Sequence, residues 1–220
     1  MRIITCPGVF APRSDTWMLA EVLTSQAGLE GADVLEVGTG SGAIAVAAAR
    51  GGAASVTAVD VSRRALLCAW LNARLNGARV EPRHGDLFAP VRDRRFDYVV
   101  SNPPYLPSPD PQAGRQLPKR GPARAWEGGS DGRSILERIC AQVGYHLRPG
   151  GTLLLMQSSV TGLTRTLDVL ESAGLHADVV ARRRGPLGPL LSARAAALRA
   201  RGLLGPADEE ELYVVRGQRR

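Results

Sequence analysis

The stretch "LEVGTGSGAIA", residues 35–45, joins an apolar run to an alanine-rich segment through three glycines. The run "ADVLEVG" (32–38) is typical of a buried parallel strand, and "SGAIAVAAARGG" (41–52) is helical by composition. The glycines allow a tight turn and let a ligand approach the backbone closely. The stretch therefore predicts a strand, a turn and a helix that bind a ligand together.

The same alternation continues through the rest of the chain. Apolar runs predict strands at 55–61, 79–86, 95–102, 150–158, 175–183 and 210–218, and helical patterns cover 62–77, 133–147, 162–174 and 191–202. Seven prolines make 103–131 an irregular loop. This order predicts an α/β fold with a doubly wound, mostly parallel seven-stranded sheet. The short connection before 210–218 predicts an antiparallel C-terminal strand in a hairpin at the sheet edge.

We expect one domain over residues 1–220, because no internal repeat or linker separates two cores. Residues 1–30 form an N-terminal segment with a helix within 12–28, which Ser14 or Asp15 can cap. Residues 189–205 form a helical excursion between strands six and seven. Helical spacing places Trp17 and Trp70 in the core, and the arginines at 194, 199 and 201 fit a solvated helix face.

Charge and composition restrict the function classes. The net charge is +7 with a pI of about 10.1, and Lys119 is the only lysine among 28 basic residues. A nucleic-acid partner stays open but is disfavoured, because G+C-rich coding produces the same arginine excess. The sequence has no apolar run long enough for a membrane span, no signal-peptide pattern and no metal-ligand spacing. Three scattered cysteines suggest a reducing compartment, so we expect a cytoplasmic protein.

The acid at the end of the second strand narrows the ligand class. Asp60 lies twenty residues after Gly40, where a carboxylate can bind both hydroxyls of a ribose. The loop alone also satisfies the G-x-G-x-x-[G/A] dinucleotide pattern, so NAD stays open at this point. Glu36 suits the ammonium group of an amino acid better than a pyrophosphate. Asp86 in "GDLF" can accept a hydrogen bond from an adenine amine. These two acids favour S-adenosylmethionine.

The stretch "SNPPYLP", residues 101–107, ends the fourth strand with an amide, two prolines and an aromatic ring. Its position at the carboxyl end of a strand predicts that Asn102 faces the same crevice as the glycine loop. The Asn102 side-chain carbonyl and the Pro103 backbone carbonyl can accept both protons of a planar NH₂ group. Such binding orients the nitrogen lone pair toward an electrophile, which predicts methyl transfer by positioning.

At this point a resemblance is apparent. "LEVGTGSG", "AVDVS", "GDLF" and "FDYVVSNPPYLP" resemble class I S-adenosylmethionine-dependent N-methyltransferases with an NPPY motif. Within that group the chain resembles the HemK-type protein-glutamine methyltransferases, which modify the Gly-Gly-Gln glutamine of peptide-chain release factors. "FAPRSDTWMLAEVL" is similar to the P-x-x-D-T segment of that family, and "AWEGGSDG" (125–132) to its GG-x-DG segment.

The resemblance implies roles for individual residues. Glu36 and the glycine loop would hold the methionine end of the cofactor, Asp60 the ribose, and Asp86 with Leu87 the adenine. The implied cofactor-binding residues are Thr16, Glu36, Gly38, Thr39, Gly40, Gly42, Asp60, Val61, Asp86, Leu87 and Asn102. The implied catalytic residues are Asn102, Pro103, Pro104 and Tyr105.

The resemblance also implies partners. Bacterial members carry an N-terminal helical domain, whereas this chain is more similar to the short archaeal and eukaryotic form, which acts with a small partner subunit. We therefore expect a protein substrate, possible help from a partner subunit, and no membrane. Methylation of adenine in DNA or RNA, of another protein side chain or of a small-molecule amine remains an alternative. A cofactor-binding scaffold and a nicotinamide oxidoreductase are disfavoured.

Overall fold

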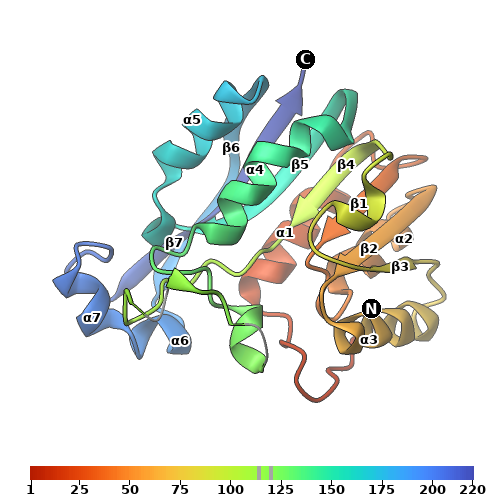
Figure 1. Cartoon of the computed structure of the whole chain (residues 1–220). Coiled ribbons are helices and arrows are strands. Elements are labelled where there is room, and N and C mark those ends of the chain that lie inside the picture. Colours follow the sequence, from red (N-terminus) through yellow and green to blue (C-terminus); the bar gives the residue numbers. More distant parts are fainter. Residues whose placement is uncertain (113–114, 119–120) are drawn as a thin grey trace.

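The computed structural model describes residues 1–112, 115–118 and 121–220. One seven-stranded sheet organises these residues, with strand order β3-β2-β1-β4-β5-β7-β6 (Figure 1). Strands β1 to β5 run parallel, and β7 is antiparallel to both of its neighbours. The strands are β1 (Asp33–Val37), β2 (Ser55–Asp60), β3 (Glu81–His84), β4 (Phe96–Ser101), β5 (Leu147–Ser158), β6 (Leu175–Pro186) and β7 (Glu209–Arg219). The predicted fold class is confirmed.

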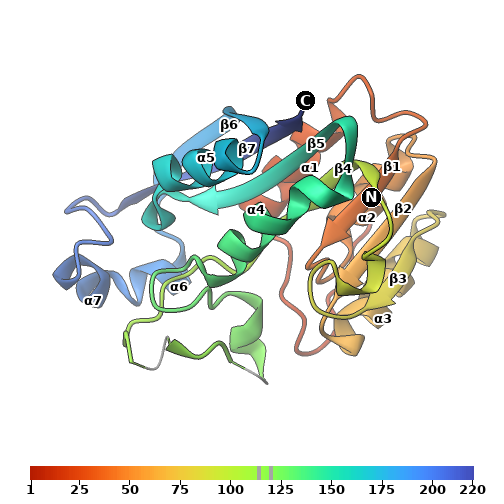
Figure 2. The ribbon, with the colours of Figure 1, turned by 45° about the horizontal axis from the view of Figure 1, so that its top comes forward.

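Helices cover both faces of the sheet (Figures 1 and 2). One face carries α1 (Ser14–Thr24), α2 (Ala43–Arg50) and α3 (Arg63–Leu75), and the other carries α4 (Ser134–His146) and α5 (Leu163–Ser172). Each face has its own apolar cluster, one around Leu19, Leu23 and Ile44 and the other around Leu136 and Ile139. The sheet is thus doubly wound, as predicted. Short 3₁₀ turns lie at Ala89–Val91, Pro122–Ala125 and Ser159–Thr161.

The central strands bring three predicted site positions to one edge of the sheet. Val37 of β1 is level with Val59 of β2 and with Ser101 of β4. The next residues in the chain are Gly38, Asp60 and Asn102. Because parallel strands end at the same edge, the fold gathers these residues as the sequence predicts.

The C-terminal hairpin is more elaborate than the sequence suggests. β7 pairs with β5 as well as with β6, so it lies inside the sheet and β6 forms the edge. The excursion between β6 and β7 holds two short helices, α6 (Pro189–Ser192) and α7 (Ala195–Ala200), instead of the single predicted helix over 191–202. Helical structure is interrupted between α6 and α7 at Ala193 and Arg194. Strand β3 is also shorter than predicted, because it is a fully exposed edge strand.

Two further predictions are wrong. Arg13, rather than Ser14 or Asp15, precedes the first helical residue of α1, and its backbone N–H donates to the Thr16 hydroxyl. Trp17 and Trp70 are 37% and 40% exposed. In both helices smaller side chains occupy the buried positions.

No helix within 1–112, 115–118 or 121–220 combines the length and the apolar character that a membrane crossing requires.

Candidate active site

The turn after β1 opens onto a cavity. Gly38 and Gly40 have φ values of +74° and +54°, which favour glycine, and a Cβ built on either would meet no atom within 4 Å. The N–H groups of Gly38 and Thr39 both donate to the Val59 carbonyl and fix the turn against β2. The backbone here is therefore rigid and bare on the cavity side, where a ligand can approach it.

Gly42 has a role in packing. It does not line the cavity; a Cβ at this position would overlap Ala69 of α3. Its φ of +79° at the start of α2 also favours glycine. The third glycine of the loop thus permits close packing of α2 against α3, and its contact with a cofactor remains a prediction.

Glu36 is a buried acid at the end of β1, 2% exposed. Its Oε2 atom accepts hydrogen bonds from the Thr39 hydroxyl at 2.6 Å and from the Ala45 N–H at 2.9 Å. Burial raises the pKa of Glu36, the two donors oppose that rise, and the charge of the nearby Asp60 adds to it. The resulting pKa is about 8. A carboxyl group held in this way is ready to ionise when a cationic group enters the cavity.

Asp60 is fixed by the backbone on both sides. Its Oδ2 atom accepts from the Gly40 N–H at 3.0 Å, and its Oδ1 atom accepts from the Ser62 N–H at 2.8 Å. Burial raises its pKa, and the same two donors oppose that rise. Each carboxylate oxygen keeps a second lone pair, so the group can still accept hydroxyl hydrogen bonds from a ligand.

The residues predicted to hold an adenine also border this cavity. Leu87 has a φ of +46°, rare for a branched residue, and its side chain is nearly buried. Asp86 forms an ion pair with Arg138 of α4 at 2.5 Å, so one of its oxygens is already engaged. Val61 is 39% exposed beside them. Their contact with a base remains a prediction.

The first cavity has a volume of about 1130 Å³ and lies over the carboxyl ends of β1, β2 and β4. It is large enough for a nucleoside-sized ligand with space left over. Residues 8–12 of the N-terminal segment and residues within 116–118 and 121–125 also line it. The predicted cofactor-binding residues that the structure brings together here are Thr16, Glu36, Gly38, Thr39, Gly40, Asp60, Val61, Asp86, Leu87 and Asn102.

Asn102 is held by a residue that the sequence analysis considered only as a helix cap. The side-chain Nδ2 atom donates to Oδ2 of Asp15 on α1 at 3.1 Å and to the Thr16 hydroxyl at 3.4 Å. An ionised carboxylate can only accept hydrogen bonds, so the amide nitrogen must face Asp15. The amide oxygen of Asn102 is left available for a ligand.

Tyr105 shares the same anchor. Its hydroxyl donates to Asp15 Oδ2 at 2.9 Å. Burial, followed by the charge of Asp15, keeps the pKa of Tyr105 well above its usual value, so the hydroxyl remains a donor. Asp15 is itself only 8% exposed. It therefore fixes the first and last residues of the NPPY motif to the N-terminal helix.

A second, smaller cavity of about 200 Å³ adjoins the first. The four predicted catalytic residues, Asn102, Pro103, Pro104 and Tyr105, all line it, and Asn102 and Pro104 line both cavities. Phe10 and Trp126 contribute aromatic walls, with ring centroids 5.8 Å apart. The NPPY motif thus borders both the large cavity and the small one.

The "GGSDG" segment packs against the catalytic loop. Two backbone hydrogen bonds join the segments. The Leu106 N–H donates to the Trp126 carbonyl, and the Gly128 N–H donates to the Leu106 carbonyl. A Cβ at Gly132 would overlap the Tyr105 carbonyl oxygen. This segment therefore needs glycine because the NPPY backbone lies directly against it.

Sequence reasoning missed three contributors to the site. Asp15 was visible within the segment similar to P-x-x-D-T, but a helix-capping role was assigned to it. Arg194 and Arg201 gave no signal, because nothing local indicates that an arginine in a distant excursion reaches the NPPY loop. Their hydrogen bonds to Pro107, Ser108 and Ser130 show that the predicted solvated face is wrong.

Comparison with known proteins agrees with this geometry. The profile of the "Methyltransferase small domain" family matches residues 1–116. A protein of Methanocaldococcus jannaschii named "Putative protein N5-glutamine methyltransferase" is 35% identical over 186 residues, which cover 84% of this chain and 90% of that protein. The chain belongs to the methyltransferase small domain family. The resemblance to glutamine methyltransferases inferred from the motifs is confirmed.

Other relatives of this small-domain methyltransferase differ in length. A release factor glutamine methyltransferase of Geobacter sulfurreducens is 40% identical over 154 residues, covering 69% of this chain but 54% of that enzyme. The chain thus spans about half the length of this bacterial relative. The Encephalitozoon protein in the "E. cuniculi Mtq2-Trm112 complex" has the same fold, with a TM-score of 0.65 at 22% identity over 97% of this chain and 99% of that one.

Proposed function

We propose that this methyltransferase transfers a methyl group from S-adenosylmethionine to the side-chain nitrogen of a glutamine in a peptide-chain release factor. The observation that carries the proposal is the fixed orientation of Asn102, whose amide oxygen is free between the two cavities. Relatives named for glutamine methylation across most of this chain support the acceptor. The Gly-Gly-Gln motif is the expected target.

The donor set in the large cavity fits S-adenosylmethionine. Glu36 offers a buried carboxyl group for the ammonium end, and its raised pKa falls when a cation pairs with it. Asp60 offers free lone pairs for two hydroxyl groups, and the bare backbone at Gly38 and Gly40 leaves space for a close approach. When bound, this cofactor supplies an electrophilic sulfonium methyl group.

The residues of the small cavity would hold the acceptor nitrogen. The Asn102 amide oxygen and the Pro103 carbonyl oxygen accept the two N–H groups of the glutamine carboxamide. The prolines fix φ and keep these acceptors apart at a constant spacing. The nitrogen forms a bond to the methyl carbon as the sulfur–carbon bond breaks, and one N–H proton is released. Positioning of the nucleophile is the main contribution of the protein.

Transfer of radiolabel from methyl-labelled S-adenosylmethionine tests the proposal. The acceptors are a release factor, its variant with the motif glutamine changed to alanine, duplex DNA and total RNA. Label on the first and none on the second is the expected result. Label on nucleic acid instead would replace the proposal with adenine methylation.

The matched variants are Asn102→Ala and Asp60→Ala. Asn102→Ala should abolish transfer and leave cofactor affinity nearly unchanged, whereas Asp60→Ala should weaken cofactor binding. Turnover retained in Asn102→Ala would remove Asn102 from catalysis.

Two associated expectations remain part of this proposal. Cofactor binding without transfer to any acceptor would favour a requirement for a small partner subunit, which can then be added to the assay. A cytoplasmic location is in keeping with the free thiols of Cys6, Cys68 and Cys140.

A further inference from the structure

The excursion, residues 189–205, forms one wall of the small cavity. Pro189, Leu190 and Leu191 of α6 line it together with the NPPY motif, Phe10 and Trp126. The wall is apolar, and Leu190 is its partly exposed member. An acceptor side chain that enters this cavity with its nitrogen at Asn102 would therefore meet α6 as one of the walls.

A separate apolar cluster joins the excursion to the catalytic loop. Leu191, Ala195, Leu198 and Leu204 pack with Leu106, and the rings of Tyr105 and Trp126 pack against this cluster. The cluster is distinct from the two that cover the sheet faces. The excursion is therefore packed on the NPPY loop and not simply appended to the β6–β7 hairpin.

Two arginines fasten the excursion to the loop. Arg194 pairs with Glu127 at 2.7 Å and donates to the Pro107 carbonyl at 3.3 Å, and the two charged side chains are only 13% and 15% exposed. Arg201 donates to the carbonyl oxygens of Ser108 and Ser130, at 2.6 Å each. Together the two guanidinium groups bridge both segments of the loop, the one after NPPY and the one containing "GGSDG".

The other end of the excursion is fixed to the sheet. Glu210 of β7 accepts the Ser158 hydroxyl through Oε2 at 2.8 Å and the Gly188 N–H through Oε1 at 3.2 Å. The residue just before α6 is thereby tied to the carboxyl end of β5. The excursion is therefore held at both ends, by Glu210 before α6 and by Arg194 and Arg201 after it.

We propose that the excursion sets the length of the acceptor side chain and that Arg194 is the positioning residue that holds this wall against the catalytic loop. The proposal rests on the proposed function, because it takes the small cavity as the acceptor site. It assigns a role to a segment that the family motifs do not explain.

The first test changes the wall. Leu190→Ala removes apolar volume from the wall of the cavity that Asn102 also lines, which makes room for a side chain one methylene longer. We expect the ratio of kcat/KM for a peptide carrying homoglutamine over the glutamine peptide to rise about tenfold. The affinity for S-adenosylmethionine should not change. An unchanged ratio would overturn the assignment of α6 as the length-setting wall.

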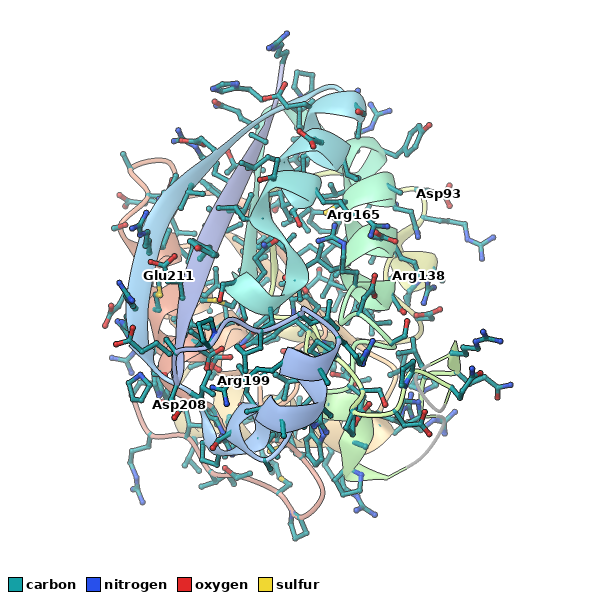
Figure 3. The ribbon with its side chains drawn as sticks, turned by 90° about the vertical axis from the view of Figure 1, so that its left-hand side faces the viewer. Asp93, Arg138, Arg165, Arg199, Asp208 and Glu211 are labelled. Atoms are coloured by element: carbon teal, nitrogen blue, oxygen red, sulfur yellow. The ribbon has the colours of Figure 1, made fainter. Side chains whose placement is uncertain are left out.

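The second test changes the contact of Arg194 with Glu127 and Pro107, here called the clamp, and needs no acceptor. Arg194→Met is compared with Arg199→Met, because the bonds of Arg199 within the described part of the chain go to Gly205, Ala207 and Asp208, within and just after the excursion. Figure 3 shows Arg199 beside Asp208. Hydrogen exchange at the amides of Leu106, Ser108 and Gly128, which are bonded across the loop, should accelerate at least about tenfold in Arg194→Met alone. Equal exchange in the two variants would overturn the clamp.

Kinetics and a milder variant complete the comparison. Arg194→Met should raise the acceptor KM by about tenfold with little change in cofactor affinity, since misplacement of a wall acts on acceptor binding. Arg194→Lys keeps the charge near Glu127 and should fall between the wild type and Arg194→Met, which guards against a misfolded Met variant. Failure of the wild type to label a release factor would contradict the proposed function. The hydrogen-exchange comparison would still test the role of Arg194.

Discussion

The carboxylate of Asp15 receives four hydrogen bonds from three residues of the site. Its Oδ1 atom accepts from the Thr16 N–H and hydroxyl, and its Oδ2 atom accepts from Asn102 and Tyr105. This arrangement decides which end of the Asn102 amide faces the cavities. A residue of the N-terminal helix thus sets the polarity of the catalytic amide, although it does not belong to the NPPY motif.

Asp15→Asn should therefore lower kcat by about a hundredfold. The variant has one acceptor oxygen and one NH₂ group, so it cannot accept from Thr16 on one side and from Asn102 and Tyr105 on the other. If the oxygen faces Thr16, the NH₂ group opposes the Asn102 amide nitrogen and Asn102 loses its fixed orientation. Cofactor affinity should stay within about twofold in equilibrium binding. Glu21→Gln, an exposed acid on the same helix, is the control and should leave kcat unchanged. Full activity in Asp15→Asn would show that the amide is oriented by other contacts.

Glu36 should make the stability of the ligand-free protein depend on pH. Its pKa in the folded protein is about 8, above the ordinary value of 4.5, so the folded state binds the proton more tightly than the unfolded state. Its contribution to the free energy of unfolding is therefore full below pH 4.5 and is lost as pH rises toward 8. Urea unfolding at pH 6 and at pH 8 measures how much free energy of unfolding is lost between them. The loss should be smaller in Glu36→Gln than in the wild type or in Glu30→Gln, which changes an exposed acid. Parallel losses in all three would contradict the shift.

At the scale of elements, the contact between α2 and α3 decides how the glycine loop is placed. Gly42 immediately precedes α2. Ala69 of α3 lies so close to it that a Cβ on Gly42 would overlap Ala69. Small residues line the buried face of α3 for the same reason: Ala65, Cys68, Ala69 and Ala73. The close approach of two helices, and not only the needs of a ligand, explains the third glycine.

Gly42→Ala should destabilise the protein by about 2–4 kcal/mol, from a left-handed backbone and an overlap with Ala69 together. Gly77→Ala is the matched control, because Gly77 has a φ of +64° and an added Cβ would meet nothing within 4 Å. It should cost about 1 kcal/mol from the backbone alone. Denaturant unfolding measures both, and adding Ala69→Gly should recover part of the difference. Equal costs in Gly42→Ala and Gly77→Ala would exclude the steric contribution.

The elements themselves were mostly predictable, and the errors have physical causes. Strands with continuous apolar runs and helices with clear caps follow from local pattern, as "LEVGTGSG" and "FDYVVSNPPY" illustrate. The same pattern misplaced Trp17 and Trp70, because local spacing alone does not show which positions of a helix are buried. It also missed Asp15 and Arg194, whose partners lie 87 to 90 and 67 residues away in the chain. Local sequence predicts which motifs form a site, but not the distant side chains that orient them.

At the scale of the whole molecule, the position of β7 between β5 and β6 joins the hairpin to the parallel sheet. Val215 of β7 is fully buried and is level with Leu155 on one side and Val179 on the other. The bidentate pair between Asp178 and Arg216 lies nearby but remains more than a third exposed. Burial of apolar side chains, more than this ion pair, should hold the hairpin in place.

Val215→Ala should therefore cost about 2–3 kcal/mol and Asp178→Asn less than about 1 kcal/mol, both measured by denaturant unfolding. A loss larger in Asp178→Asn than in Val215→Ala would reverse this ranking. Added salt should weaken the effect of the second substitution only, because exposed charges are screened.

The place of β7 has a consequence for the newly made chain. Strand β6 is synthesised before residues 187–208, yet its pairing partner within the sheet follows them. At about 5–20 residues per second, translation leaves β6 waiting roughly 2–7 s for β7, and the open edge of β5 waits longer still. During that interval two unpaired strand edges can pair with other nascent chains or be bound by chaperones. Substitutions that slow the emergence or pairing of 209–219 should therefore lower the yield of folded enzyme more than they lower its final stability.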